Sequence, residues 1–264
     1  MAADDRAFFD DGAAYERLMG RWSRLVGAVF IDWLEVPTGL SWLDVGCGNG
    51  AFTEVMVAGA APAGVQGIDP SEAQIAYARG RAPLTRAEFR VGGAEALPFA
   101  DASVDVAVMA LVITFVTNPA KAVGEMVRVV KPGGLVATYM WDIMGGCFPL
   151  EPLRAGLLAI TGDAPRSPGA EVSQKAELRR LWTEAGLEAV ETREIEIEVA
   201  YRDFDDFWDS NMALATPIVQ KVRALSPADL DRLKSNLRQS LQKGADGRIA
   251  FAARANAVKA RVPR

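Results

Sequence analysis

The segment LDVGCGNG, residues 43–50, predicts a buried strand that breaks into a glycine-rich turn. Its first residues are apolar, whereas Gly46, Gly48 and Gly50 remove three Cβ atoms within five positions. Glycine adopts backbone conformations that other residues avoid, and its missing side chain lets a ligand approach backbone N–H groups closely. Asp44 adds a carboxylate at the mouth of this turn. The segment therefore predicts a ligand site at the end of a strand.

The spacing of the glycines in the turn fits a dinucleotide-binding protein. Gly46, Gly48 and Ala51 satisfy the G-x-G-x-x-G/A dinucleotide fingerprint, which makes a Rossmann-type NAD-dependent oxidoreductase one candidate. A single match of this kind is weak evidence, so the rest of the chain has to distinguish the candidates.

Length and composition favour one α/β domain over residues 1–264. Half of the 264 residues are apolar, which is enough for a large core. The net charge of −5 gives no field that would attract phosphate backbones or anionic lipids, so neither nucleic acid nor a membrane is an expected partner.

The N-terminal residues, the apolar runs and the cysteines together predict a cytoplasmic protein. The N-terminal residues lack the basic and apolar regions of a secretory signal, and the longest apolar run, residues 106–116, is shorter than the ~20 residues of a membrane span. Two cysteines, Cys47 and Cys147, are too few for a disulfide framework, which fits a reducing compartment. Their spacing is not that of metal ligands, so no metal site is expected. The chain contains no histidine, which excludes a histidine base or a Ser-His-Asp triad.

The first 38 residues are expected to form a helical cap segment. Apolar residues recur at spacings of three and four over residues 13–35, which indicates an amphipathic helix that ends near Pro37. This apolar series consists of Leu18, Trp22, Leu25, Val29 and Trp33.

Strand and helix signals then alternate. Strands are predicted at 41–45, 64–68, 88–91, 104–111 and 135–140, and helices at 51–60, 71–79 and 119–130, with a turn at Lys131-Pro132-Gly133-Gly134. Such alternation predicts a parallel sheet with right-handed crossovers.

The second half has a different pattern. Helices are predicted at 149–160 and 173–185, followed by a sixth strand in which Ile195, Ile197 and Val199 alternate with glutamates, as in an edge strand with one solvated face. A final strand is predicted at 249–258, so residues 201–246 form a helical insertion that includes a helix capped by Ser226.

Five ordered motifs together resemble one family. LDVGCGNG, GIDPS, VGGAEALPF, VDVAV and VKPGG, between Trp42 and Trp141, resemble class I S-adenosylmethionine-dependent methyltransferases, in particular the small-molecule group typified by ubiquinone and menaquinone C-methyltransferases. The resemblance implies a three-layer αβα sandwich whose seven-stranded, mostly parallel sheet has the order 3-2-1-4-5-7-6, with the seventh strand antiparallel. It also implies S-adenosylmethionine as cofactor and S-adenosylhomocysteine as product.

The resemblance further implies which residues hold that cofactor. Asp44 would lie under its ammonium group, Asp69 would accept its ribose hydroxyls, and Tyr15 and Arg21 would reach its carboxylate. The rest of the cofactor would contact the glycine turn, the end of the second strand, the loop after the third strand, which would border the adenine, and the end of the fourth strand. The residues concerned are Gly46, Cys47, Gly48, Pro70, Gly93, Ala94, Glu95, Ala110 and Leu111. Helix capping by Asp69 and a surface salt bridge of Arg21 remain alternatives.

A sulfonium is already an activated methyl donor, so alignment of the acceptor and exclusion of water can suffice for transfer. Asp142 is the candidate general base by position, with a structural loop aspartate as the alternative. Aromatic residues that would line an apolar acceptor pocket, or else belong to the core, are Trp22, Phe115, Trp141 and Trp208.

The family pattern is not complete. Gly93 stands where many relatives have an aspartate, and Thr114 where many have a histidine, so a domain that binds the cofactor without catalysis is a further alternative. The acceptor, the methylated atom (O, N or C) and the choice between monomer and homodimer are left open by the sequence.

Overall fold

The computed structural model describes residues 12–84, 86–241, 244 and 247–264, with side chains described from Met19 onward. Its strands form one sheet of order β3-β2-β1-β4-β5-β7-β6, in which β7 is antiparallel to both of its neighbours and the other pairs are parallel. This confirms the predicted order. The strands are β1 Ser41–Val45, β2 Gly64–Asp69, β3 Ala87–Val91, β4 Val104–Ala110, β5 Val130–Trp141, β6 Glu188–Tyr201 and β7 Ile249–Arg261.

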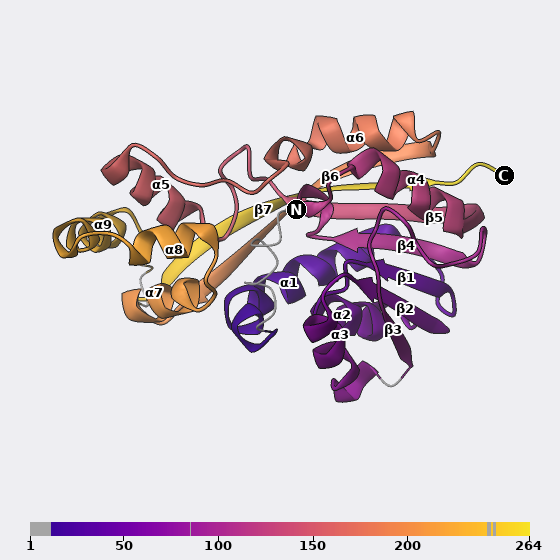
Figure 1. Cartoon of the computed structure of the whole chain (residues 1–264), viewed down its shortest axis with the longest axis horizontal. Coiled ribbons are helices and arrows are strands. Elements are labelled where there is room, and N and C mark those ends of the chain that lie inside the picture. Colours follow the sequence, from indigo (N-terminus) through magenta and orange to yellow (C-terminus); the bar gives the residue numbers. More distant parts are fainter. Residues whose placement is uncertain (1–11, 85, 242–243, 245–246) are drawn as a thin grey trace.

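Helices cover both faces of this sheet, as in a three-layer sandwich (Figure 1). One face carries α1 Gly12–Leu34, α2 Ala51–Ala60 and α3 Glu72–Arg79, and the other carries α4 Pro119–Val129 and α6 Lys175–Glu184. The remaining helices are α5 Glu151–Thr161, α7 Phe204–Met212, α8 Pro217–Arg223 and α9 Pro227–Ser240, with short 3₁₀ turns η3 Ala82–Leu84, η4 Ile113–Phe115 and η5 Ala170–Ser173.

The insertion between β6 and β7 lies beyond the carboxyl ends of the parallel strands. Residues 255–261 of β7 pair with β5, whereas its earlier residues pair only with β6. Because β7 runs antiparallel to β5, those earlier residues extend past the end of β5, where they lead to α7, α8 and α9 (Figure 1). Open α/β sheets bind ligands at the carboxyl ends of their strands, so the insertion is placed beside the expected site.

The buried face of α1 differs from the predicted one. Trp22, Val26, Phe30 and Leu34 are fully or almost fully buried, whereas Leu25, which the series of apolar residues placed inside, is 45% exposed. Both series have helical spacing, so periodicity alone could not choose between adjacent faces of a helix this rich in apolar residues. Leu18 lies outside the side chains that the structure describes.

The predicted Lys131–Gly134 turn is part of β5 in the structure. Gly133 takes a left-handed φ of 76°, and the pairing of β4 with β5 shifts its register between Val104 and Val106. A glycine in this conformation lets the strand bulge without ending. The remaining expected strands are observed within a few residues of their predicted bounds, except β6, which is longer at both ends.

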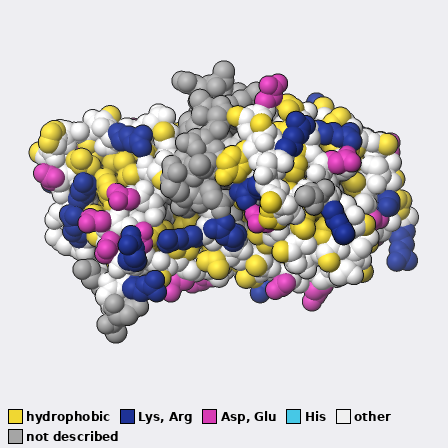
Figure 2. All heavy atoms as spheres, turned by 90° about the horizontal axis from the view of Figure 1, so that it is seen from below, with side chains coloured by type: hydrophobic (Ala, Val, Ile, Leu, Met, Phe, Trp, Pro, Cys, Tyr) yellow, Lys and Arg dark blue, Asp and Glu magenta, His cyan; other side chains and the backbone are white. Residues whose placement is uncertain are grey.

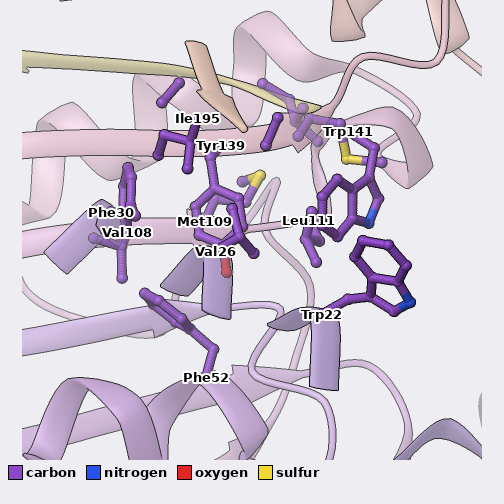
Figure 3. Packing of buried hydrophobic residues seen from close by; sticks show 14 of the residues in the cluster. Trp22, Val26, Phe30, Phe52, Val108, Met109, Leu111, Tyr139, Trp141 and Ile195 are labelled. Carbon is purple, nitrogen blue, oxygen red and sulfur yellow. The ribbon is translucent and has the colours of Figure 1, made fainter. Parts of the chain in front are cut away.

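An aromatic cluster joins α1 and α2 to β5 (Figure 3). The ring of Tyr139 lies 4.6 Å from that of Phe30 and 5.6 Å from that of Phe52, between centroids. Trp22 meets Trp141 edge-on at 6.1 Å. Burial of one such ring stabilises the fold by roughly 1.5–3 kcal/mol, so the cluster fixes α1 against the end of β5.

Basic and acidic side chains are interspersed on the face of the molecule shown in Figure 2. Among the described residues, no helix combines the length and apolar character that crossing a membrane requires.

Candidate functional site

A cavity of about 310 Å³ opens at the carboxyl ends of β1, β2 and β4. We call it the first cavity. Ten of the residues predicted to hold a cofactor line it: Gly46, Cys47, Gly48, Asp69, Pro70, Gly93, Ala94, Glu95, Ala110 and Leu111. The structure thus brings the glycine turn, the end of β2 and the loop at residues 92–95 together around one space.

Gly46, Gly48 and Gly50 all have backbone conformations that other residues rarely adopt, and two of them are also closely packed. Gly46 has φ of 75°, and a Cβ there would lie 2.6 Å from the side chain of Val112. Gly50 has φ of 81°, and a Cβ there would lie 2.8 Å from Leu84. The turn therefore needs glycine both for its conformation and for close packing.

The backbone N–H groups of the turn are less available than the sequence suggests. Those of Gly46 and Cys47 both donate to the carbonyl of Ile68, at 2.7 and 3.0 Å. The N–H of Gly48 donates to Asp69, and that of Gly50 to the carbonyl of Cys47. Since these N–H groups donate within the protein, the turn offers few free hydrogen-bond donors to a phosphate.

Asp69 lies at the wall of the first cavity and is held by backbone donors. Its Oδ2 accepts the N–H of Gly48 and its Oδ1 the N–H of Ser71, both at 2.9 Å. The N-cap of α3 is Ser71, whose hydroxyl accepts the N–H of Gln74. Helix capping is therefore the task of Ser71, and the carboxylate of Asp69 is fixed beside the cavity instead.

Asp44 lies under the turn, fully buried and outside the cavity wall. Thr53 donates its hydroxyl to Oδ2 at 2.6 Å, while Oδ1 has no hydrogen-bond partner among the described residues. Burial raises the pKa of this carboxyl to about 7; the bond from Thr53 opposes the rise and the negative charge of Asp69 adds to it. Such a carboxyl is half-ionised near neutral pH and would gain from a nearby cation.

Cys47 is buried, and burial followed by the charges of Asp44 and Asp69 raises the pKa of its thiol well above the usual value. It is a neutral packing residue at physiological pH, since only a thiolate is nucleophilic.

Two polar residues of the first cavity were not predicted. Ser23, on α1, and Gln74, on α3, line the cavity and are almost fully buried. Neither the Ser23 hydroxyl nor Oε1 of Gln74 has a hydrogen-bond partner among the described residues. A ligand in the cavity could supply those partners, and an isolated serine or glutamine on a helix carries no sequence signal that would have marked it.

A second cavity of about 150 Å³ adjoins the first. Leu111 and Phe115 line both cavities, so they form the wall between them. The second cavity is mainly apolar, and Trp141 from β5 is among the residues that line it. Its other walls come from α1, the loop at 165–168 and α8.

Several predicted site residues lie elsewhere. The guanidinium of Arg21 lies 6.0 Å from the ring centre of Tyr201, and Trp22 is buried between Trp141 and Phe251. Trp208 stacks on Phe204 and lies under the ammonium of Lys234. None of these three lines either cavity, and the side chain of Tyr15 lies outside the described residues.

Asp142 also lines neither cavity. Its Oδ2 accepts a hydrogen bond from Arg254 at 2.6 Å, and its Oδ1 accepts the N–H of Gly145 at 3.0 Å. The residue thus joins β5 to β7 through a salt bridge. Its predicted role as a general base has no support from this geometry and stays a prediction.

Comparisons with known proteins add to this picture. Residues 43–138 match a family model described as a methyltransferase domain. An uncharacterised 37.1 kDa protein in transposon Tn4556 of Streptomyces fradiae is 34% identical over 55% of this chain and 44% of its own length. A demethylmenaquinone methyltransferase of Renibacterium salmoninarum is 35% identical over 61% of this chain and 66% of its own length. The chain therefore spans less than two thirds of these curated relatives.

A solved structure supports the fold. Phosphoethanolamine N-methyltransferase 2 of Haemonchus contortus, in complex with phosphomonomethylethanolamine and S-adenosylhomocysteine, is similar with a TM-score of 0.57. The likeness covers 97% of this chain and 58% of that protein at 19% identity. Residues 43–138 match a methyltransferase domain, and the chain resembles the class I S-adenosylmethionine-dependent methyltransferases, a demethylmenaquinone methyltransferase among them.

Proposed function

We propose that this chain transfers a methyl group from S-adenosylmethionine to a small-molecule acceptor. The observation that carries the proposal is the pair of adjoining cavities. The first is walled by the glycine turn and Asp69, the second is apolar, and the two meet at Leu111 and Phe115. A cofactor in the first cavity and an acceptor in the second would therefore share one boundary, where transfer can occur.

The residues of the first cavity fit this cofactor. A Cβ at Gly48 or Gly93 would meet no atom within 4 Å, so both positions leave room for a ligand. Ser23 and Gln74 present buried polar atoms that lack partners among the described residues. Asp69 would hold the ribose hydroxyls, and the half-ionised Asp44 would favour a cationic amino acid end close to the turn.

When bound, S-adenosylmethionine supplies a methyl group already activated by a sulfonium. The task of the chain is then to orient the acceptor and exclude water, which proximity and an apolar wall can achieve. Leu111 and Phe115 provide that wall, and Tyr139 closes the first cavity beside them. Mass spectrometry of the labelled product identifies the atom that receives the methyl group.

The geometry of the turn disfavours the NAD-dependent alternative. A dinucleotide places its pyrophosphate on free N–H groups of the glycine turn. Here the N–H groups of Gly46, Cys47, Gly48 and Gly50 all donate within the protein. A cofactor without phosphates suits such a turn better.

Transfer to a defined acceptor tests the proposal. The protein would be incubated with S-adenosylmethionine that carries a deuterated methyl group and with fractionated small metabolites, and products would be read by mass spectrometry. We expect a labelled small molecule together with S-adenosylhomocysteine. Binding of S-adenosylhomocysteine without label in any fraction would favour a non-catalytic binding domain.

We also propose that the chain acts in the cytoplasm, as a monomer or homodimer, without nucleic acid or a membrane as partner. The net charge of −5 and the mixed charges of the face in Figure 2 support the part of this proposal that concerns nucleic acid and membranes. In size-exclusion chromatography we expect the protein to elute at the same volume with and without added DNA, because it does not bind the DNA.

A further inference from the structure

The described side chains that line the second cavity include hydrogen-bond donors but no carboxylate. Apart from its apolar lining, its side chains are Arg166, Ser167 and Thr216, together with the indole of Trp141. The Thr216 hydroxyl accepts the N–H of Val219 as the N-cap of α8, so its oxygen is already used. No aspartate, glutamate or lysine is among the described residues that line this cavity.

Trp141 supplies a buried donor that lacks a partner. The residue is 5% exposed, and its Nε1–H finds no acceptor among the described residues. In Figure 3 its ring lies beside Leu111, and the indole nitrogen is on the side of the ring toward Trp22, away from Tyr139 and Phe30. A buried N–H without an acceptor is unfavourable, so a ligand oxygen that reached this N–H from the cavity would be stabilised.

Arg166 supplies an unpaired cation. It lies in the loop at 165–168, which lines the cavity, and it makes no ion pair, hydrogen bond or ring contact with the part of the chain that the structure describes. The loop is held in place, because Gly169 packs so closely on η4 that a Cβ there would lie 2.8 Å from the carbonyl oxygen of Thr114.

Two nearby acids are already bound by other cations. Asp163, in the same loop as Arg166, pairs with Lys221. Glu151, next to the cavity residue Leu150, is bound through both of its oxygens by Arg154, at 2.7 Å each. Neither carboxylate is therefore available to neutralise Arg166.

From these observations we propose that the acceptor is an apolar molecule with one anionic oxygen group, held by the Arg166 guanidinium and the Trp141 indole N–H. The inference rests on the proposed function and names the substrate class of the second cavity. Arg166 is exposed to solvent, and a charge-assisted hydrogen bond from it to an anionic oxygen is stronger than a neutral one. A neutral acceptor would gain no such charge-assisted bond, and a cationic one would be repelled.

Two probes of the same shape test the role of charge. The probes are 2-naphthoate and the neutral 2-naphthamide, titrated with and without saturating S-adenosylhomocysteine and followed by calorimetry. We expect the wild-type protein to bind naphthoate about tenfold more tightly than the amide. Arg166→Gln should remove this preference and leave the affinity for the amide unchanged.

The Trp141 indole makes a different prediction. Because both probes carry an oxygen that can accept its N–H, Trp141→Phe should weaken both by about three- to tenfold and keep the preference for the anion. Arg193→Gln is the matched control, since Arg193 is an exposed arginine on the edge strand β6 and does not line the cavity. It should change neither affinity.

Equal binding of the two probes by the wild-type protein, or a preference that survives in Arg166→Gln, would overturn the proposal. Failure of S-adenosylhomocysteine to bind, with the preference for naphthoate intact, would instead overturn the proposed function and leave the anion site standing.

Discussion

Gly48 donates its backbone N–H to Oδ2 of Asp69 at 2.9 Å, across 21 residues of sequence. The bond joins the glycine turn after β1 to the acid that ends β2, so the two motifs form one wall of the first cavity. A change at Asp69 should therefore alter both the ligand contact and the position of the turn.

The first prediction concerns Asp69→Ala. We expect its affinity for S-adenosylhomocysteine to fall at least about tenfold, since hydrogen bonds to a charged group contribute about 1.5–3 kcal/mol each. Calorimetry measures the loss. Full affinity in this variant would contradict the ribose role of Asp69.

Asp105→Ala is the matched control. Asp105 also accepts a backbone N–H and a hydroxyl, both from Ser41, but it lies at the amino ends of the strands, away from the cavities. This variant should lower thermal stability and leave the affinity for S-adenosylhomocysteine unchanged.

The second prediction concerns the pH dependence of stability through Asp44. Burial raises the pKa of its carboxyl from 3.8 to about 7 on folding, so between these pH values the folded state holds a proton that the unfolded state releases. Stability that this group contributes therefore falls as pH rises from about 4 to about 7.

Asp44→Asn should remove that slope, because asparagine is neutral and can still accept the hydroxyl of Thr53. Urea unfolding of the ligand-free protein at pH 5 and pH 8 is the measurement. We expect the free energy of unfolding of the variant, relative to that of the wild type, to be higher at pH 8 than at pH 5. An identical pH dependence in both proteins would contradict the raised pKa.

The third prediction uses the open space at Gly93. Because a Cβ there meets no atom within 4 Å and the residue lines the first cavity, Gly93→Leu should fold normally and block the cofactor. Gly124 on α4 is equally unhindered and lies outside both cavities, so Gly124→Leu is the control. Only the first variant should lose binding of S-adenosylhomocysteine, at an unchanged melting temperature; retained binding would place the cofactor elsewhere.

The fourth prediction concerns Asp142→Asn. Loss of the partner of Arg254 should lower stability, by about 3 kcal/mol at most for a partly buried pair, and leave the affinity for S-adenosylhomocysteine unchanged. Differential scanning calorimetry and turnover on the identified acceptor give the two readouts. An unchanged turnover would exclude the general base role, whereas lost turnover at full stability would support it.

The parts of the site that sequence reasoning found are those carried by local motifs. Gly46, Asp69 and Glu95 follow strands whose order the motifs define, so their convergence at the carboxyl ends of the sheet could be predicted. Their geometry could not, and the turn proved to use its own N–H groups.

Residues that depend on distant partners were beyond the sequence. Asp142 is held by Arg254, 112 residues away, and nothing near it in the chain indicates that pairing. Trp22 and Trp208 are aromatic as expected of an acceptor pocket, yet both pack elsewhere. Ser23 and Gln74 matter only because the packing of α1 and α3 buries their polar atoms beside a cavity.

The central claim is that the first cavity holds S-adenosylmethionine and its product. Titration calorimetry of the wild-type protein with S-adenosylhomocysteine and, separately, with NAD tests it most directly. The account predicts micromolar affinity, about −8 kcal/mol, for S-adenosylhomocysteine and no heat with NAD. No detectable binding of S-adenosylhomocysteine, or tighter binding of NAD, would contradict it.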